Sequence, residues 1–168
     1  MILTSREERQ WFLRNLAFGL YEYLGVAAPP VPVEELLKHP PEVLSEDLGV
    51  VDMYSNLWDA TFARLPNQSG SIFVRIDLES DERRYVLARE ILSALITSNQ
   101  GRSLGLPELL LSDLRESAEY FARQLIAPEI LVAAYRKRGG GQREFGQAFG
   151  LPAHAAMARW DDQAQLPN

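Results

Sequence analysis

Apolar residues recur at helical spacing in two stretches of the chain, and this pattern constrains the fold more than any other feature of the sequence. The stripe in residues 81–98 consists of Leu87, Ile91, Ala94 and Leu95, and the stripe in residues 112–127 consists of Leu114, Ala118, Phe121 and Leu125. Residues three or four positions apart share one face of a helix, so each stretch has one apolar face to bury. The two stretches therefore predict two core helices that pack side by side.

The rest of the chain predicts shorter helices and a small sheet. Further helices are expected at residues 5–24 and 33–38 and, after Pro128, at residues 129–137, 142–149 and 152–160. Between Leu48 and Asp77, β-branched and aromatic residues with turn residues between them predict strands at residues 49–54, 60–65 and 71–76. Because strands joined by short turns pair antiparallel, we expect a meander. The expected fold class is α+β, with a small antiparallel three-stranded sheet and a short helical C-terminal segment.

Serine residues mark three of the expected helix starts. Ser5 and Glu8 have the spacing of a capping box, in which each side chain bonds the backbone of the other residue. Ser80 and Ser112 stand just before the two core helices, where a hydroxyl oxygen can accept a hydrogen bond from a free backbone N–H. These three serines are therefore predicted to be helix caps.

Composition restricts the chemistry that the chain can perform. With 168 residues, 46% of them hydrophobic and 24% charged, the chain is expected to form one globular domain with a single core. The absence of cysteine excludes disulfides, thiolate metal sites and cysteine nucleophiles, and it fits a cytoplasmic location. No apolar run approaches the ~20 residues that cross a bilayer, and the opening MILTSREERQ lacks the order of a signal peptide. We therefore expect a cytoplasmic protein without membrane contact.

The charges argue against broad attraction to nucleic acid, because the net charge is −6. One local basic patch stands out around the glycines 139–141. It consists of Arg136, Lys137, Arg138 and Arg143. Cations and glycine are both typical of a helix C-terminus, so a solvated helix end is favoured over a phosphate site, which remains the alternative.

Four segments resemble the ImmA/IrrE family of peptidase-like proteins. The string RYVLAREILSAL at residues 84–95 resembles the active helix of that family, which usually reads RFTLAHELGH, and residues 71–77 resemble the strand before it. PPVPVEEL at residues 29–36 is similar to the family's PPVPVxxL, and AEYFARQLIAP at residues 118–128 is similar to its ANxFAxxLLMP. FGQAFGLP at residues 145–152 is similar to its terminal AxxFxVS. The segments follow the order of the family and span most of the chain.

The resemblance implies a zincin-like fold in two parts. Residues 1–128 would form a peptidase-like domain, with a first helix at 5–24, the sheet at 49–76, a degenerate active helix at 81–98 and a second core helix at 112–127. Residues 129–168 would form a C-terminal helical segment packed on it.

The ligands of a catalytic zinc are missing from the matching positions. In an HExxH helix, two histidines four residues apart bind zinc and the glutamate polarises the bound water. Those histidine positions hold Arg89 and Ser93, and a guanidinium has no lone pair to offer a cation. The family's third ligand, an acidic residue on the next helix, is either missing or displaced to Glu116. Glu90 matches the general base but has no metal-activated water, so we expect no catalytic residue, no metal and no cofactor.

The remaining candidates leave alternatives open. Arg89 would either take the place of the zinc, bridging to Glu116 or Glu119 on the next helix, or point to water. The two histidines, His39 and His154, are too far apart in the sequence to form a metal-binding pair on one helix face. They are expected to be surface or cap residues rather than ligands.

Two functions follow from this combination. Members of the family act on or beside helix-turn-helix repressors of stress responses and mobile elements, so the resemblance implies a catalytically inactive regulatory or interaction protein that binds such a regulator. The expected contact residues are Tyr135, Arg136, Arg138 and Trp160, although Trp160 fits a core position at least as well. The alternative is a metallopeptidase whose magnesium or manganese site is built from Glu90, Glu116 and Glu119. Direct DNA binding by the terminal helices is opposed by the net charge.

Overall fold

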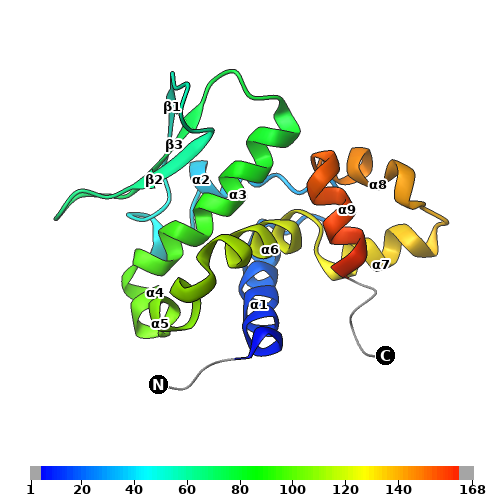
Figure 1. The fold of residues 1–168 in the computed structure, drawn as a ribbon, viewed down its shortest axis with the longest axis horizontal. Helices are drawn as coiled ribbons and strands as arrows, with labels where there is room; N and C mark the ends of the chain where they lie inside the picture. The colour runs from blue at the N-terminus through cyan, green and yellow to red at the C-terminus, as the bar shows by residue number, and fades with distance from the viewer. Residues whose placement is uncertain (1–4, 163–168) are drawn as a thin grey trace.

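The two predicted core helices form the centre of the molecule in a computed structural model, which describes residues 5–162. Helix α3 (Ser80–Thr97) and helix α6 (Leu114–Ile126) pack against each other, and the first helix, α1 (Arg6–Leu24), packs against α6 (Figure 1). The predicted apolar stripes supply this core, and Leu87, Ile91 and Phe121 are fully buried in it. The pairing of the core helices is therefore confirmed.

Helix α1 begins as its sequence predicts. The Ser5 hydroxyl accepts from the Glu8 N–H at 3.2 Å, and the Glu8 carboxylate accepts from the Ser5 N–H at 2.7 Å, so the capping box is present. The chain then passes through a short helix, α2 (Glu35–Lys38), and a 3₁₀ turn, η1 (Glu42–Leu44).

The sheet differs from the predicted antiparallel meander. Its strands, β1 (Val50–Met53), β2 (Ala60–Ala63) and β3 (Ser71–Arg75), lie in the order β1-β3-β2. Strand β3 pairs antiparallel with β2 but parallel with β1, so the expectation of an all-antiparallel sheet is wrong. The physical reason is burial, because Ile72 and Val74 of β3 have no exposed surface. In the central position β3 packs on α3, and both of its edges are hydrogen-bonded to neighbouring strands.

The connection between the core helices is helical, although the sequence analysis predicted no helix there. It contains α4 (Asn99–Ser103), α5 (Leu106–Leu110) and a 3₁₀ turn, η2 (Leu111–Asp113). The missed signal is Ser98, whose hydroxyl accepts from the Gly101 N–H at 2.9 Å and so caps α4.

Two predicted serine caps are wrong. Ser80 lies inside α3, because the extended Glu79 holds the N-cap position, and the Glu79 side chain makes no cap hydrogen bond. Ser112 lies inside η2, and Asp113 precedes α6 without a side-chain bond.

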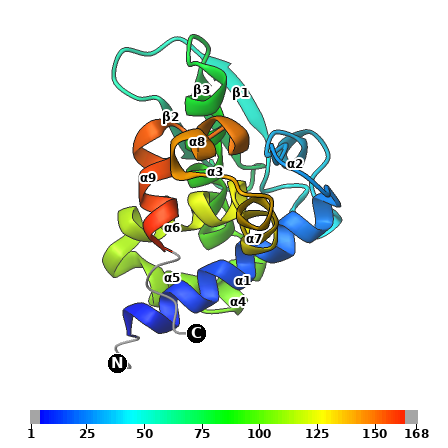
Figure 2. The same ribbon diagram turned by 90° about the vertical axis from the view of Figure 1, so that its right-hand side faces the viewer.

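The last three helices lie together at one end of the molecule, away from the sheet (Figures 1 and 2). They are α7 (Glu129–Lys137), α8 (Gln142–Phe149) and α9 (Ala153–Asp162), close to the predicted bounds. An ion pair of 2.9 Å between Arg123 of α6 and Asp162 of α9 joins this group to the core. The predicted division after residue 128 remains a proposal, and its outer ends, residues 1–4 and 163–168, lie outside the described residues. Within residues 5–162, no helix combines the length and apolar character that a membrane span requires.

Candidate functional site

The Glu90 side chain of α3 faces the sheet and is bonded to it. The Glu90 carboxylate accepts a hydrogen bond of 3.1 Å from the backbone N–H of Phe62. Phe62 belongs to β2, an edge strand whose outward N–H groups face no other strand among residues 5–162. Glu90 therefore satisfies a backbone donor and ties α3 to the edge of the sheet.

Burial is the main influence on the charge of Glu90. It raises the pKa of this carboxyl above its ordinary value, because the charged form loses solvation. The positive charge of Arg89, the Phe62 N–H and the Ser93 hydroxyl act in the opposite direction, since each favours the carboxylate. Ser93 thus stabilises the charged form of Glu90. It stands at the position where the family resemblance puts a zinc ligand.

Replacing Glu90 with glutamine is expected to raise the free energy of unfolding at neutral pH by up to about 1 kcal/mol. The amide oxygen keeps the bond from Phe62 without a buried charge. Because the folded-state pKa of Glu90 is raised, its favourable contribution is complete below the unfolded pKa and is lost as pH rises through the folded pKa. The gain should therefore shrink toward about pH 4.

Urea unfolding of the two proteins at neutral pH and at about pH 4 measures this difference in stability. Glu108→Gln, at an exposed carboxylate on α5, is the control and should change stability little at either pH. A clear loss of stability in Glu90→Gln at neutral pH would contradict the interpretation that burial dominates.

Arg89 does not bridge to the carboxylates that the sequence suggested. Glu116 pairs at 2.7 Å with Arg6 of α1, and Glu119 pairs at 3.4 Å with Arg115, one turn earlier on α6. The half-buried Arg89 instead places its Cζ 5.4 Å from the centre of the Tyr85 ring. Its Nε is buried without a hydrogen-bond partner in the described part of the chain. The predicted ion pair is wrong because nearer arginines hold both acids.

The structure does not assemble the carboxylate metal site of the alternative reading. Glu90 faces β2, whereas Glu116 lies in the first turn of α6 beside α1. Among residues 5–162, no group of three or more histidine, aspartate or glutamate side chains could hold a metal ion.

The two histidines lie at the surface, as predicted, but one has an unexpected neighbour. His39 is exposed near Glu35. His154, at the start of α9, lies 3.7 Å from Glu82 and contacts the Tyr85 ring edge-on at 5.3 Å between ring centres. The sequence could not show that α9 reaches the first turns of α3, because the two are far apart along the chain.

The candidate contact residues of the terminal helices lie close together. The Tyr135 hydroxyl donates to the Gly141 carbonyl at 2.9 Å, and its ring packs edge-on against Phe145. Trp160 also packs on Phe145, and the Arg136 guanidinium lies 4.0 Å from the centre of the Trp160 ring. Tyr135 and Trp160 therefore help to hold the terminal helices together. Arg138 is exposed at the end of α7.

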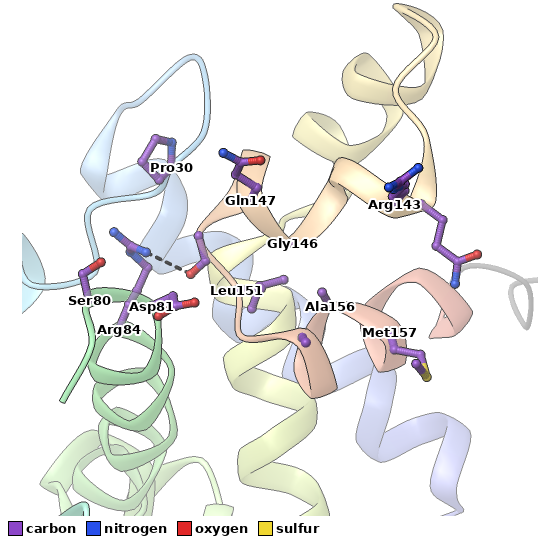
Figure 3. A pocket seen from close by; sticks show the side chains of 13 residues that line it. Pro30, Ser80, Asp81, Arg84, Arg143, Gly146, Gln147, Leu151, Ala156 and Met157 are labelled. Carbon is purple, nitrogen blue, oxygen red and sulfur yellow. Dashed lines mark hydrogen bonds between the residues drawn. The ribbon is translucent and has the colours of Figure 1, made fainter.

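Sequence reasoning missed a hollow between the start of α3 and the turn that joins α8 to α9 (Figure 3). Its volume is about 720 Å³, and Arg84 and Arg143 are among its lining residues. The lining comes from segments far apart in the sequence, so no local pattern could reveal it. The arginine that opens the matched active-helix string was a signal that the sequence analysis did not use.

Comparison with known proteins supports the fold and leaves the family open. No protein-family model and no curated protein matches the chain. Among solved structures, the fold is similar to that of a chain described as a "Mycobacterium tuberculosis transcriptional regulator", with a TM-score of 0.61 and 15% sequence identity. The match covers 94% of this chain and 48% of the regulator, so this chain spans about half of that protein's length. At this identity the likeness shows an α+β fold shared with part of a transcriptional regulator, and it does not confirm the ImmA/IrrE resemblance.

Proposed function

We propose that this chain is a catalytically inactive, metallopeptidase-like regulatory domain, a degenerate relative of the ImmA/IrrE proteins, that binds a helix-turn-helix transcriptional regulator. The observation that carries the proposal is the hydrogen bond of Glu90 to the sheet. The Glu90 carboxylate is bonded to the Phe62 N–H at the position where the resemblance puts a general base. The neighbouring Arg89 lies on Tyr85 at the position of a zinc-binding histidine.

The chemistry of these groups supports binding rather than hydrolysis. A general base of this class acts on a metal-activated water, and the positions beside Glu90 that would hold the metal ligands are Arg89 and Ser93. A guanidinium beside it supplies positive charge but cannot polarise a water by coordination.

The regulatory part of the proposal is supported by the structural neighbour. Its printed description is that of a transcriptional regulator, and the similarity extends over nearly the whole of this chain. We propose that the present chain also acts on gene expression, in the cytoplasm, through contact with a regulator.

The contact surface that we propose is centred on the exposed side of the terminal helices. Arg136 stacks on Trp160, and Arg138 is exposed two residues later. The Tyr135 hydroxyl bonds the Gly141 carbonyl and so fixes the glycine turn that follows. Tryptophan, tyrosine and arginine are the residue types that most often carry binding energy at protein interfaces.

Affinity capture from the native host, with intact-mass analysis of the captured proteins, tests the proposed function. The expected result is an uncleaved helix-turn-helix protein whose recovery falls at least about tenfold for Arg136→Glu, since charge reversal at an interface costs more than 1.4 kcal/mol. Arg102→Glu makes the same charge change on the exposed surface of α4 and should leave recovery unchanged. Capture of a cleaved regulator, or equal recovery with both variants, would contradict the proposal.

A further inference from the structure

The hollow between α3 and the α8–α9 turn has the size and lining of a small-molecule site. Its volume of about 720 Å³ falls in the usual range for ligand pockets, roughly 300–1,000 Å³. Leu151 and Ala156, both buried, and the exposed Met157 give it apolar surface. Polar side chains stand around this surface, as Figure 3 shows.

Arg84, one of the polar residues that line the hollow, is held in place by a hydrogen bond to the turn between α8 and α9. Its Nη1 donates to the Gly150 carbonyl at 2.9 Å, and the side chain is half-buried. Gly150 has a φ of 65°, and a Cβ at this position would overlap the guanidinium. Within the described residues Arg84 forms no ion pair, although the Asp81 carboxylate, one turn earlier on α3, lines the same hollow.

Arg143 supplies a second positive charge on the far side of the hollow. It is exposed near the start of α8 and has no ion pair within residues 5–162. Figure 3 shows Arg84 and Arg143 on opposite sides of the hollow, with Leu151 and Ala156 between them.

The remaining polar groups are compatible with a negative ligand. The amides of Gln142 and Gln147 and the Ser80 hydroxyl belong to the lining. The acidic member, Asp81, accepts from the Glu82 N–H at 3.0 Å, and its carboxylate is thus engaged by its own helix.

We propose that this hollow binds a small organic anion, a carboxylate or phosphate group carried on a compact apolar body. Arg84 binds the anionic group through its free N–H donors, Arg143 approaches it from the opposite side, and the apolar body lies on Leu151 and Ala156. Guanidinium groups that form no ion pair within the described residues are suited to this task, since charge-assisted bonds to carboxylate or phosphate are strong.

This site goes beyond the proposed function, because it would make the domain responsive to a metabolite. The ligand would contact α3 on one side and the α8–α9 segment on the other. The same segment carries Trp160, so a bound anion would stabilise the packing of the proposed contact surface on the core.

NMR titration of the full chain tests the proposal. Phenyl phosphate and phenylacetate are the two anionic probes, and benzyl alcohol is the neutral control. We expect saturable shifts of the Gly146 and Gly150 amides with at least one anion below about 10 mM, weaker binding at high salt, and no such shifts with the alcohol. The two anionic arms distinguish a phosphate from a carboxylate ligand.

Charge variants give the second readout. Arg143→Gln should weaken binding about tenfold, as expected for the loss of a charge-assisted contact, whereas Lys137→Gln removes one exposed charge outside the hollow and should not. Arg84→Lys, which keeps the charge but loses the fork of donors, should also weaken binding. No saturable shift with either anion, shifts located elsewhere, equal binding by Arg143→Gln and Lys137→Gln, or binding of the alcohol would each overturn the proposal.

Discussion

Replacing Arg159 with alanine is expected to lower the free energy of unfolding by about 3 kcal/mol. This side chain of α9 is 1% exposed, and its Nε donates to the Ala127 carbonyl at 2.9 Å. Truncation leaves that carbonyl without its donor and leaves a cavity where the long side chain packed. An ion pair of 3.2 Å with the half-exposed Glu129 is lost as well, but water can solvate that carboxylate.

The cost of burying this charge makes a second variant informative. Burial lowers the pKa of Arg159, because the charged guanidinium loses solvation that its partners only partly replace. Arg159→Met refills most of the volume without a charge and should therefore cost about half as much as alanine. Lys137→Ala, at an exposed site on α7, should change stability by less than about 0.5 kcal/mol. Urea unfolding of the three variants decides the matter, and an alanine variant as stable as the Lys137 control would contradict the structure.

Replacing Gly150 with alanine is expected to cost about 2–3 kcal/mol. One part is conformational, since a φ of 65° is unfavourable for any residue with a Cβ. The other part arises because the new methyl group would displace the Arg84 guanidinium and break its bond to the residue 150 carbonyl.

Gly25→Ala separates the two parts. Gly25 ends α1 with a φ of 66°, but no atom of the described residues outside its own chain neighbours lies within 4 Å of a Cβ placed there. This variant should therefore show the conformational cost alone, about 1–2 kcal/mol. Thermal or urea unfolding that gives equal losses for the two variants would show that Arg84 does not hold the α8–α9 turn.

Periodicity was enough to predict the core helices, because burial of one helix face is a local property of the sequence. The stripe that includes Leu87 and Ile91 is buried as expected. The sheet order was not predictable in the same way. A short strand such as β1 carries the same residues whether its neighbour is parallel or antiparallel, and the choice depends on which strand α3 covers.

The sequence named candidate site positions but could not name the partners of their side chains. The sequence identified Arg89, Glu90 and Ser93, yet their contacts come from other segments. Glu90 is bonded to Phe62, 28 residues earlier, and Glu116 is held by Arg6 at the start of α1. Side-chain partners of this kind depend on tertiary packing, so no spacing rule could have found them.

We propose above all that α3 corresponds to the active helix of a metallopeptidase without its metal chemistry. The most direct test is metal analysis of the purified chain after exposure to zinc and removal of free metal, combined with a peptide hydrolysis assay. The account predicts no stoichiometric zinc and no hydrolysis, because Arg89 and Ser93 supply no imidazole and Glu90 is bonded to the sheet. A single zinc ion held tightly by each chain, whose removal by a chelator abolishes hydrolysis, would contradict it.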